Sequence, residues 1–127
     1  MHKIKLVYSK LSYQIIGLAY EIFNELGYGY REKYYQKAFE QLLQENKIQY
    51  SREALVRTKF HNKQFAIVFL DFIIKNKIIV ELKSQERFKK SNIKQIYEYL
   101  KSNNLKLGLL INFTKDGIKS KRILNLY

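Results

Sequence analysis

Two acidic residues and a lysine stand within or at the end of apolar segments, where a folded chain buries apolar side chains. Asp71 lies inside the apolar run from residue 65 to 74, and Glu81 and Lys83 close a second run that begins at Ile78. Burying a charge is costly unless the charge is paired or binds a metal. Two carboxylates beside a lysine can hold a hard cation next to a cationic group, which is the equipment for hydrolysing a phosphodiester.

The spacing of these residues predicts that they meet in the folded chain. Side chains two apart on a strand share a face, so Glu81 and Lys83 project together while the Leu82 side chain points the other way. A hairpin turn at residues 75–76 places Asp71 opposite Glu81. The two carboxylates repel each other unless a cation lies between them. We therefore expect Asp71, Glu81 and the Leu82 carbonyl to bind Mg²⁺, with Mn²⁺ as an alternative. A surface ion pair at a strand end is the competing interpretation.

The elements that must position this site follow from hydrophobic periodicity. Helical spacing predicts a helix to residue 26, with Ser9 or Ser12 as its cap. The other elements are predicted as a helix over 32–45, strands over 53–60, 64–74 and 77–83, a helix over 91–102 and a strand over 107–112. This α-α-β-β-β-α-β order predicts an α/β fold with a central mixed four-stranded sheet flanked by helices. A further short strand near residues 118–124 is left open.

Composition narrows the class of protein. The 127 residues predict one domain over 1–127, and the absence of cysteine excludes disulfides and fits a reducing, cytoplasmic compartment. The longest apolar run is too short to span a bilayer, and the start of the chain lacks the features of a signal peptide. We therefore expect no membrane association.

The charge is strongly basic, with 24 Lys and Arg residues against 11 Asp and Glu residues and a net charge of +13. Residues 83–127 hold 11 basic and 3 acidic residues, so much of the excess lies in the C-terminal third. Such a surface attracts polyanions, and nucleic acid, above all DNA, is the expected partner. A general enrichment in lysine is the alternative explanation.

Further polar residues lie where they could assist the site. Glu32 borders the apolar stripe of the second helix and is preferred as a third carboxylate, whereas Glu21 on the first helix is a secondary candidate. Gln95 and Tyr99 are four residues apart and share a helix face away from the apolar one, where they could contact a phosphate or nucleotide, although two ordinary solvent-facing residues would look the same. Other candidates for nucleic-acid contact are Lys89, Lys90, Lys94 and Tyr35, and the tyrosines expected to be exposed for stacking are Tyr30, Tyr34, Tyr99 and Tyr127.

The segment Gly29-x-x-Glu32-x-x-Tyr35 resembles the motif that names the GxxExxY protein family, within the PD-(D/E)XK nuclease superfamily. The similarity runs from about residue 15 to 113, and Gln95-x-x-x-Tyr99 is similar to the fourth motif of RecB-like nucleases. The resemblance implies a restriction-endonuclease-like core. It also implies a catalytic set of Asp71, Glu81 and Lys83, with Glu32 as the helical acid and Gln95 and Tyr99 in support. One departure is Leu70, which stands where the superfamily name has proline, at a position that varies among its members.

These observations predict a small Mg²⁺-dependent nuclease. Two other functions remain open at this point. One is a non-catalytic nucleic-acid-binding module that keeps the fold, and the other is an interaction subunit or homodimer whose sheet edge pairs with a partner. Cleavage assays separate the nuclease from the two other functions. The salt dependence of DNA binding separates the binding module from the interaction subunit.

Overall fold

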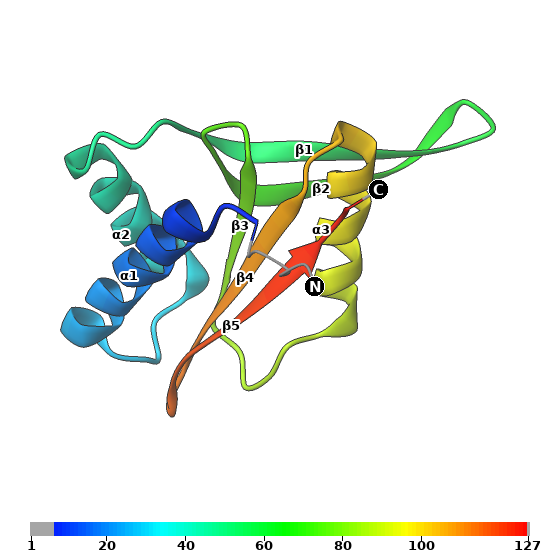
Figure 1. The fold of residues 1–127 in the computed structure, drawn as a ribbon. Coiled ribbons are helices and arrows are strands. Elements are labelled where there is room, and N and C mark those ends of the chain that lie inside the picture. The colour runs from blue at the N-terminus through cyan, green and yellow to red at the C-terminus, as the bar shows by residue number, and fades with distance from the viewer. Residues whose placement is uncertain (1–6, 127) are drawn as a thin grey trace, which may run out of the picture.

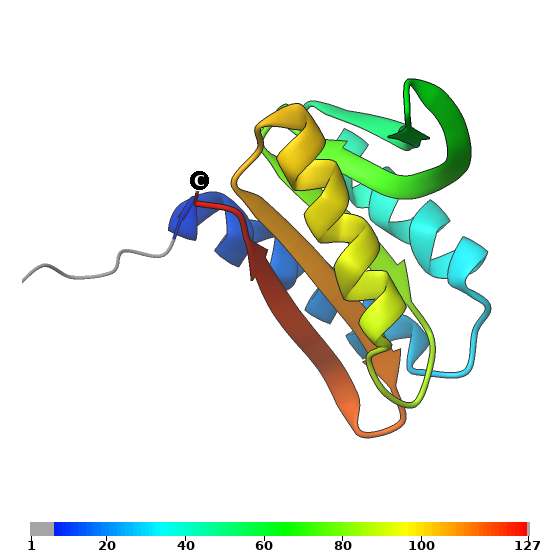
Figure 2. The ribbon, with the colours of Figure 1, turned by 90° about the vertical axis from the view of Figure 1, so that its right-hand side faces the viewer.

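The computed structural model describes residues 7–126, and for 53–60 and 64–69 it describes the backbone only. A five-stranded sheet lies between two layers of helices, with α1 and α2 on one face and α3 on the other (Figures 1 and 2). The helices are α1 (Ser9–Leu26), α2 (Glu32–Glu45) and α3 (Lys90–Asn103). The strands are β1 (Tyr50–Phe60), β2 (Lys63–Ile74), β3 (Ile78–Lys83), β4 (Leu107–Thr114) and β5 (Gly117–Leu124).

The sheet is mixed and its strands are in sequence order. Strands β1, β2 and β3 pair antiparallel through tight hairpins, β3 and β4 pair parallel across the α3 crossover, and β5 returns antiparallel to β4. The β1–β2 and β2–β3 turns each carry two consecutive residues with positive φ, at 61–62 and 75–76, which suits the twist of the flanking strands. The predicted element order and the mixed sheet are thus confirmed.

The sheet has five strands where the sequence predicted four. The segment left open as a short strand forms β5, whose eight residues pair along the whole of β4, from Leu107–Leu124 to Thr114–Gly117. The extra strand covers the edge that β4 would otherwise expose.

The predicted serine cap of α1 is wrong. Tyr8 occupies the N-cap position in a left-handed conformation (φ 52°), so Ser9 is already helical and no side chain caps the helix. The Ser12 hydroxyl instead donates to the Ser9 carbonyl at 3.1 Å, within the first turn. Helix α2 has the predicted bounds, and α3 extends one residue further at each end.

Alternation along β3 distributes its side chains between two apolar cores. Ile78, Val80 and Leu82 pack beneath α1 and α2, whereas Ile79 packs beneath α3. Helix α3 lies close to the sheet because residue 108 is glycine, since a Cβ there would collide with the Ile96 side chain. The two cores therefore fix both helix layers relative to the carboxyl end of β3, where the polar residues lie.

No helix among residues 7–126 is both long and apolar enough to cross a membrane.

Candidate active site

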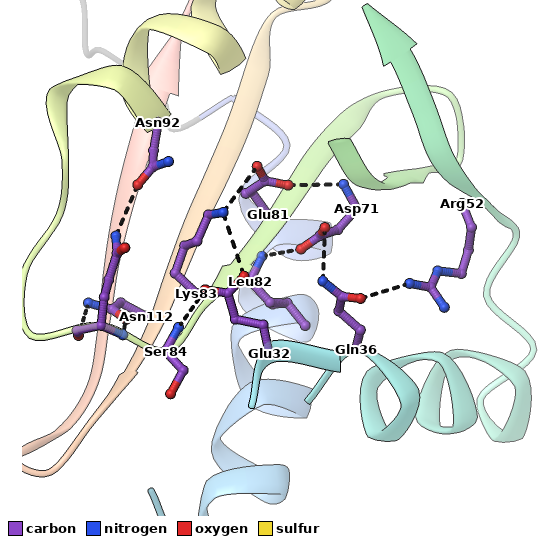
Figure 3. Close-up of polar contacts among 11 residues, drawn as sticks. Glu32, Gln36, Arg52, Asp71, Glu81, Leu82, Lys83, Ser84, Asn92 and Asn112 are labelled. Carbon is purple, nitrogen blue, oxygen red and sulfur yellow. Dashed lines mark hydrogen bonds and ion pairs between the residues drawn. The ribbon is translucent and has the colours of Figure 1, made fainter. Parts of the chain in front are cut away.

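The side chains of Asp71 and Glu81 link β2 to β3 where the backbone pairing of these strands ends. The backbone ladder runs from Ile74–Ile78 to Phe72–Val80, a register that brings residue 71 opposite residue 81 as predicted. Beyond it, the Asp71 amide donates to Glu81 Oε1 at 3.0 Å, and the Leu82 amide donates to Asp71 Oδ2 at 2.8 Å (Figure 3). Each carboxylate therefore binds the backbone of the other strand.

Lys83 lies between two acids that come from different elements. Its Nζ is 3.6 Å from Glu32 Oε1 and 4.0 Å from Glu81 Oε2 (Figure 3). Glu32 is the first residue of α2, and its other oxygen accepts from the Ser84 amide at 3.5 Å. The structure thus brings Glu32, Asp71, Glu81 and Lys83 together at the carboxyl end of β3.

Negative charge is undercompensated in this cluster, which holds three carboxylates and one ammonium group. Glu81 is only 3% exposed, and burial, followed by the charge of Asp71, raises its pKa to about 8. Burial also raises the pKa of Asp71, although its hydrogen bond from Leu82 acts in the opposite direction. An added cation would relieve both effects, because it would favour the charged form of each carboxylate.

The donor set suits a small hard cation. Each carboxylate oxygen has more than one lone-pair site, so the hydrogen bonds of Asp71 and Glu81 leave acceptor capacity free. Among the residues whose side chains the structure describes, which leave out 53–60 and 64–69, no group of three His, Cys, Asp or Glu side chains could hold a metal ion. Mg²⁺ needs only one or two carboxylates because it keeps several waters. Asp71 and Glu81, with the Leu82 carbonyl, fit that requirement.

Gln36 supports Asp71 and was missed by the sequence analysis. Its Nε2 donates to Asp71 Oδ1 at 3.1 Å, and its Oε1 accepts from Arg52 Nη2 at 3.2 Å (Figure 3). A signal was available, because Gln36 follows Glu32 by four residues and so shares its helix face. Arg52, on β1, could not have been found this way, since its contact depends on tertiary packing.

Asn112 is the second missed residue. It is 1% exposed within β4, and its amide group accepts from the Gln85 backbone N–H at 2.9 Å and donates to the Gln85 carbonyl at 2.7 Å. The Gln85 side chain in turn donates to Asn92 at 2.9 Å (Figure 3). An asparagine inside an apolar strand was the available signal. These bonds fix the loop that leaves the site after Lys83.

The predicted outward orientation of Tyr99 is wrong. Its side chain is 7% exposed and packs with Ile96 and Leu100 in the core beneath α3, and burial raises its pKa. The apolar stripe of α3 is thus wider than predicted, since it includes Tyr99 as well as Ile96 and Leu100. Gln95 remains half-buried on the same helix.

Tyr35 also proves to be a core residue. It is fully buried, its ring stacks on Phe113 at 4.0 Å between centroids, and its hydroxyl donates to the Gly27 carbonyl at 2.7 Å. The predicted contact of Tyr35 with nucleic acid is therefore wrong. Its hydroxyl instead holds the loop that leads into α2.

The remaining candidates lie outside the cluster of Glu32, Asp71, Glu81 and Lys83. Lys89, Lys90 and Lys94 are exposed at the start of α3, and Tyr30 and Tyr34 are exposed as predicted. Glu21 is exposed on α1 and lines a separate groove with Glu25 and Gln41, so the secondary acid does not join the cluster. Tyr127 lies outside the described residues.

Comparisons with known proteins identify the family and the fold. A model of the PD-(D/E)XK nuclease superfamily matches residues 9–123. The fold is similar to the crystal structure of SSO0001, with 20% identity and a TM-score of 0.56 over 93% of this chain and 58% of that one. It is also similar to an alkaline exonuclease from Laribacter hongkongensis, with 10% identity and a TM-score of 0.51 over 96% of this chain and 72% of that one. This chain thus spans little more than half the length of SSO0001. A comparison with curated proteins gave no match.

Proposed function

Because this chain belongs to the PD-(D/E)XK nuclease superfamily, we propose that it is a metal-dependent nuclease that hydrolyses phosphodiester bonds in DNA. One observation carries the proposal. The buried pair Asp71 and Glu81 is short of positive charge: burial and the charge of Asp71 raise the pKa of Glu81 to about 8, and the ammonium group of Lys83 lies 4.0 Å from Glu81 Oε2. Perturbed carboxylates next to a specific charge partner are typical of catalytic sites.

In this proposal Asp71, Glu81 and the Leu82 carbonyl would hold Mg²⁺ or Mn²⁺. A divalent ion bound there supplies a Lewis acid for the phosphate and lowers the pKa of a bound water. Lys83 donates hydrogen bonds to the attacking water or to a phosphate oxygen, so that it stabilises charge as the P–O bond to the leaving group breaks. Glu32 orients Lys83 through the 3.6 Å ion pair, and Gln36 holds Asp71 in position.

Binding of the substrate would use the basic surface next to the site. The loop after Lys83 leads directly to Lys89 and Lys90 at the start of α3, and all three lysines proposed for phosphate contact are exposed. With a net charge of +13, the protein should bind DNA in a salt-dependent manner.

We further propose membership of the GxxExxY family, which the three named positions of the motif support. Gly29 has a φ of 102°, a conformation that favours glycine, in the loop before α2. Glu32 pairs with Lys83, and Tyr35 bonds back to that loop at Gly27. In this interpretation the motif fixes the loop before α2 so that the acid at the start of the helix lies at the end of β3.

Cleavage of plasmid and of single-stranded DNA, with Mg²⁺, Mn²⁺ or EDTA, tests the proposed function. We expect cutting by the wild type only with metal, and at least about 100-fold less cutting by Asp71→Asn and Lys83→Met. We also expect Mg²⁺ to raise the melting temperature of the wild type but not of Asp71→Asn.

Equal cutting by wild type and both variants would contradict the proposal, since it would point to a contaminating nuclease. Salt-dependent DNA binding that chelator does not change, without any cutting, would instead support the non-catalytic binding module.

A further inference from the structure

A groove of about 850 Å³ opens beside the proposed catalytic residues. Three segments line it: residues 28–32 before and at the start of α2, residues 84–86 after β3, and residues 113–116 at the β4–β5 turn. Glu32 belongs both to this lining and to the ion pair with Lys83. Whatever occupies the groove therefore lies next to the place where the phosphodiester would be cut.

One wall of the groove is aromatic. Tyr28 and Tyr30 both line it, and they are 59% and 44% exposed. Tyr30 is held edge-on by two other rings, with centroids 6.2 Å from Tyr34 and 6.0 Å from Tyr35. Tyr35 is in turn stacked on Phe113. A large ring that is fixed by its neighbours and still accessible loses little conformational freedom when a ligand stacks on it.

The charges of the lining argue against a phosphate as its ligand. The groove is lined by two basic residues, Arg31 and Lys115, and by three acids, Glu32, Glu86 and Asp116. The lining thus has no excess of positive charge, although the protein as a whole carries +13. A neutral, flat group that can stack and accept or donate hydrogen bonds suits this surface better, and a nucleobase has all of these properties.

The other two lining segments are held in place by hydrogen bonds within the protein. Asn112 binds both the backbone N–H and the carbonyl of Gln85, and the Gln85 side chain donates to Asn92 at 2.9 Å. The β4–β5 turn is similarly fixed, because the Thr114 hydroxyl donates to the Gly117 carbonyl at 2.7 Å. Preorganised walls reduce the ordering cost of binding.

We propose that this groove binds an unpaired nucleobase of the cleaved strand, stacked on Tyr28 or Tyr30, next to the scissile phosphate. The inference rests on the proposed nuclease function and narrows its substrate to single-stranded or unpaired DNA. A base within a duplex has its faces covered by neighbouring bases, so it can enter a groove of this kind only after it leaves the stack.

Binding without metal tests the groove apart from catalysis. Fluorescence anisotropy in EDTA would measure the affinity for a labelled ten-nucleotide single strand and for a series of the same strand with one abasic position. We expect that the strands with the abasic position at one or two particular places bind the wild type about tenfold more weakly than the intact strand. The double variant Tyr28→Leu/Tyr30→Leu should bind the intact strand about tenfold more weakly and should lose the sensitivity to abasic positions.

Matched controls come from the same chain. Tyr28→Phe/Tyr30→Phe keeps the rings and should bind like the wild type, and so should Tyr13→Leu/Tyr20→Leu, which removes two exposed tyrosines of α1 outside the groove. If the double leucine variant does not fold, Tyr28→Ala alone carries the test, because this ring is more than half exposed.

Unchanged affinity of the leucine or alanine variant, or an abasic effect that persists in it, would overturn the groove proposal even if the wild type cuts DNA. Conversely, base-dependent binding through the tyrosines in a protein that never cuts would support the groove and contradict the proposed nuclease function.

Discussion

Two acids, Glu40 on α2 and Glu81 on β3, stand in contrasting environments. Glu40 accepts from the Tyr50 hydroxyl at 2.7 Å and from Arg52 Nη1 at 3.1 Å, and these partners, the Tyr50 hydrogen bond first, lower its pKa. Glu81 has its cation at 4.0 Å and a second carboxylate opposite, and its pKa is raised. The charge of Glu40 is thus matched by its hydrogen-bond partners, whereas that of Glu81 is unmatched. An added cation would stabilise the unmatched carboxylate more than the matched one.

The two environments are joined by Gln36. Arg52 donates both to Glu40 and to Gln36, and Gln36 passes a hydrogen bond on to Asp71. The matched cluster therefore acts as a fixed support for the unmatched one. This division resembles the general need of a reactive site for a rigid surrounding that holds its groups in place.

The largest expected effect is on cleavage. Glu81→Gln should lower the rate in Mg²⁺ by at least about 100-fold, because the amide cannot supply the negative charge that the metal needs. Glu40→Gln should change the rate less than about threefold, since it keeps an oxygen acceptor for Tyr50 and Arg52. Initial rates on single-stranded DNA measure both. Similar losses in the two variants would remove the distinction between the acids.

The second effect is on stability as a function of pH, without metal. The pKa of Glu81 is raised from 4.5 to about 8, so the folded state holds a proton that the unfolded state releases between these values. The free energy of unfolding should therefore fall as pH rises from about 5 to 8, by up to about 1.4 kcal/mol per pH unit. Urea unfolding in EDTA at several pH values would show the slope.

Two variants sharpen this test of the pH slope. Glu81→Gln should flatten the slope between pH 5 and 8, because it removes the group that titrates. Glu40→Gln should leave that slope in place, since the lowered pKa of Glu40 makes its contribution disappear only as pH falls into the acid range. A slope that Glu81→Gln leaves intact would assign the titration to another group.

The smallest effect concerns the bridge between the two clusters. Gln36→Leu should lower the cleavage rate about tenfold with little change in the Km for DNA, since Asp71 loses a positioning bond rather than a ligand. Gln41→Leu is the control, because Gln41 is exposed on the same helix and bonds only to Glu45 among the described contacts. Equal rates for the two variants would mean that Asp71 does not need the amide.

Local rules predicted the strand part of the site from the sequence. The two-residue period of a strand fixed the relation of Glu81 to Lys83, and the length of the turn at 75–76 fixed the pairing of residue 71 with residue 81. These relations depend only on neighbouring backbone. The ends of α2 followed in the same way from helical spacing, and they put Glu32 at the start of the helix.

Relations between elements were beyond such rules. Tyr99 was expected in solvent, yet it is buried in a core that also holds Ile79 of β3 and Leu110 of β4, so its burial depends on residues of other elements. The contact of Arg52 with Gln36 likewise joins β1 to α2. Helix faces that border the apolar stripe are thus assigned by packing rather than by periodicity alone.

The reciprocal bonds of Asp71 and Glu81 have an evolutionary consequence. Because each carboxylate binds a backbone amide of the opposite strand, selection for folding would retain an oxygen acceptor at both positions, Asp or Asn at 71 and Glu or Gln at 81, even in a lineage that had given up cleavage. Lys83 has no such structural bond among its described contacts, only ion pairs to Glu32 and Glu81. In related chains, the lysine should therefore be the first of the three to drift once activity is no longer selected.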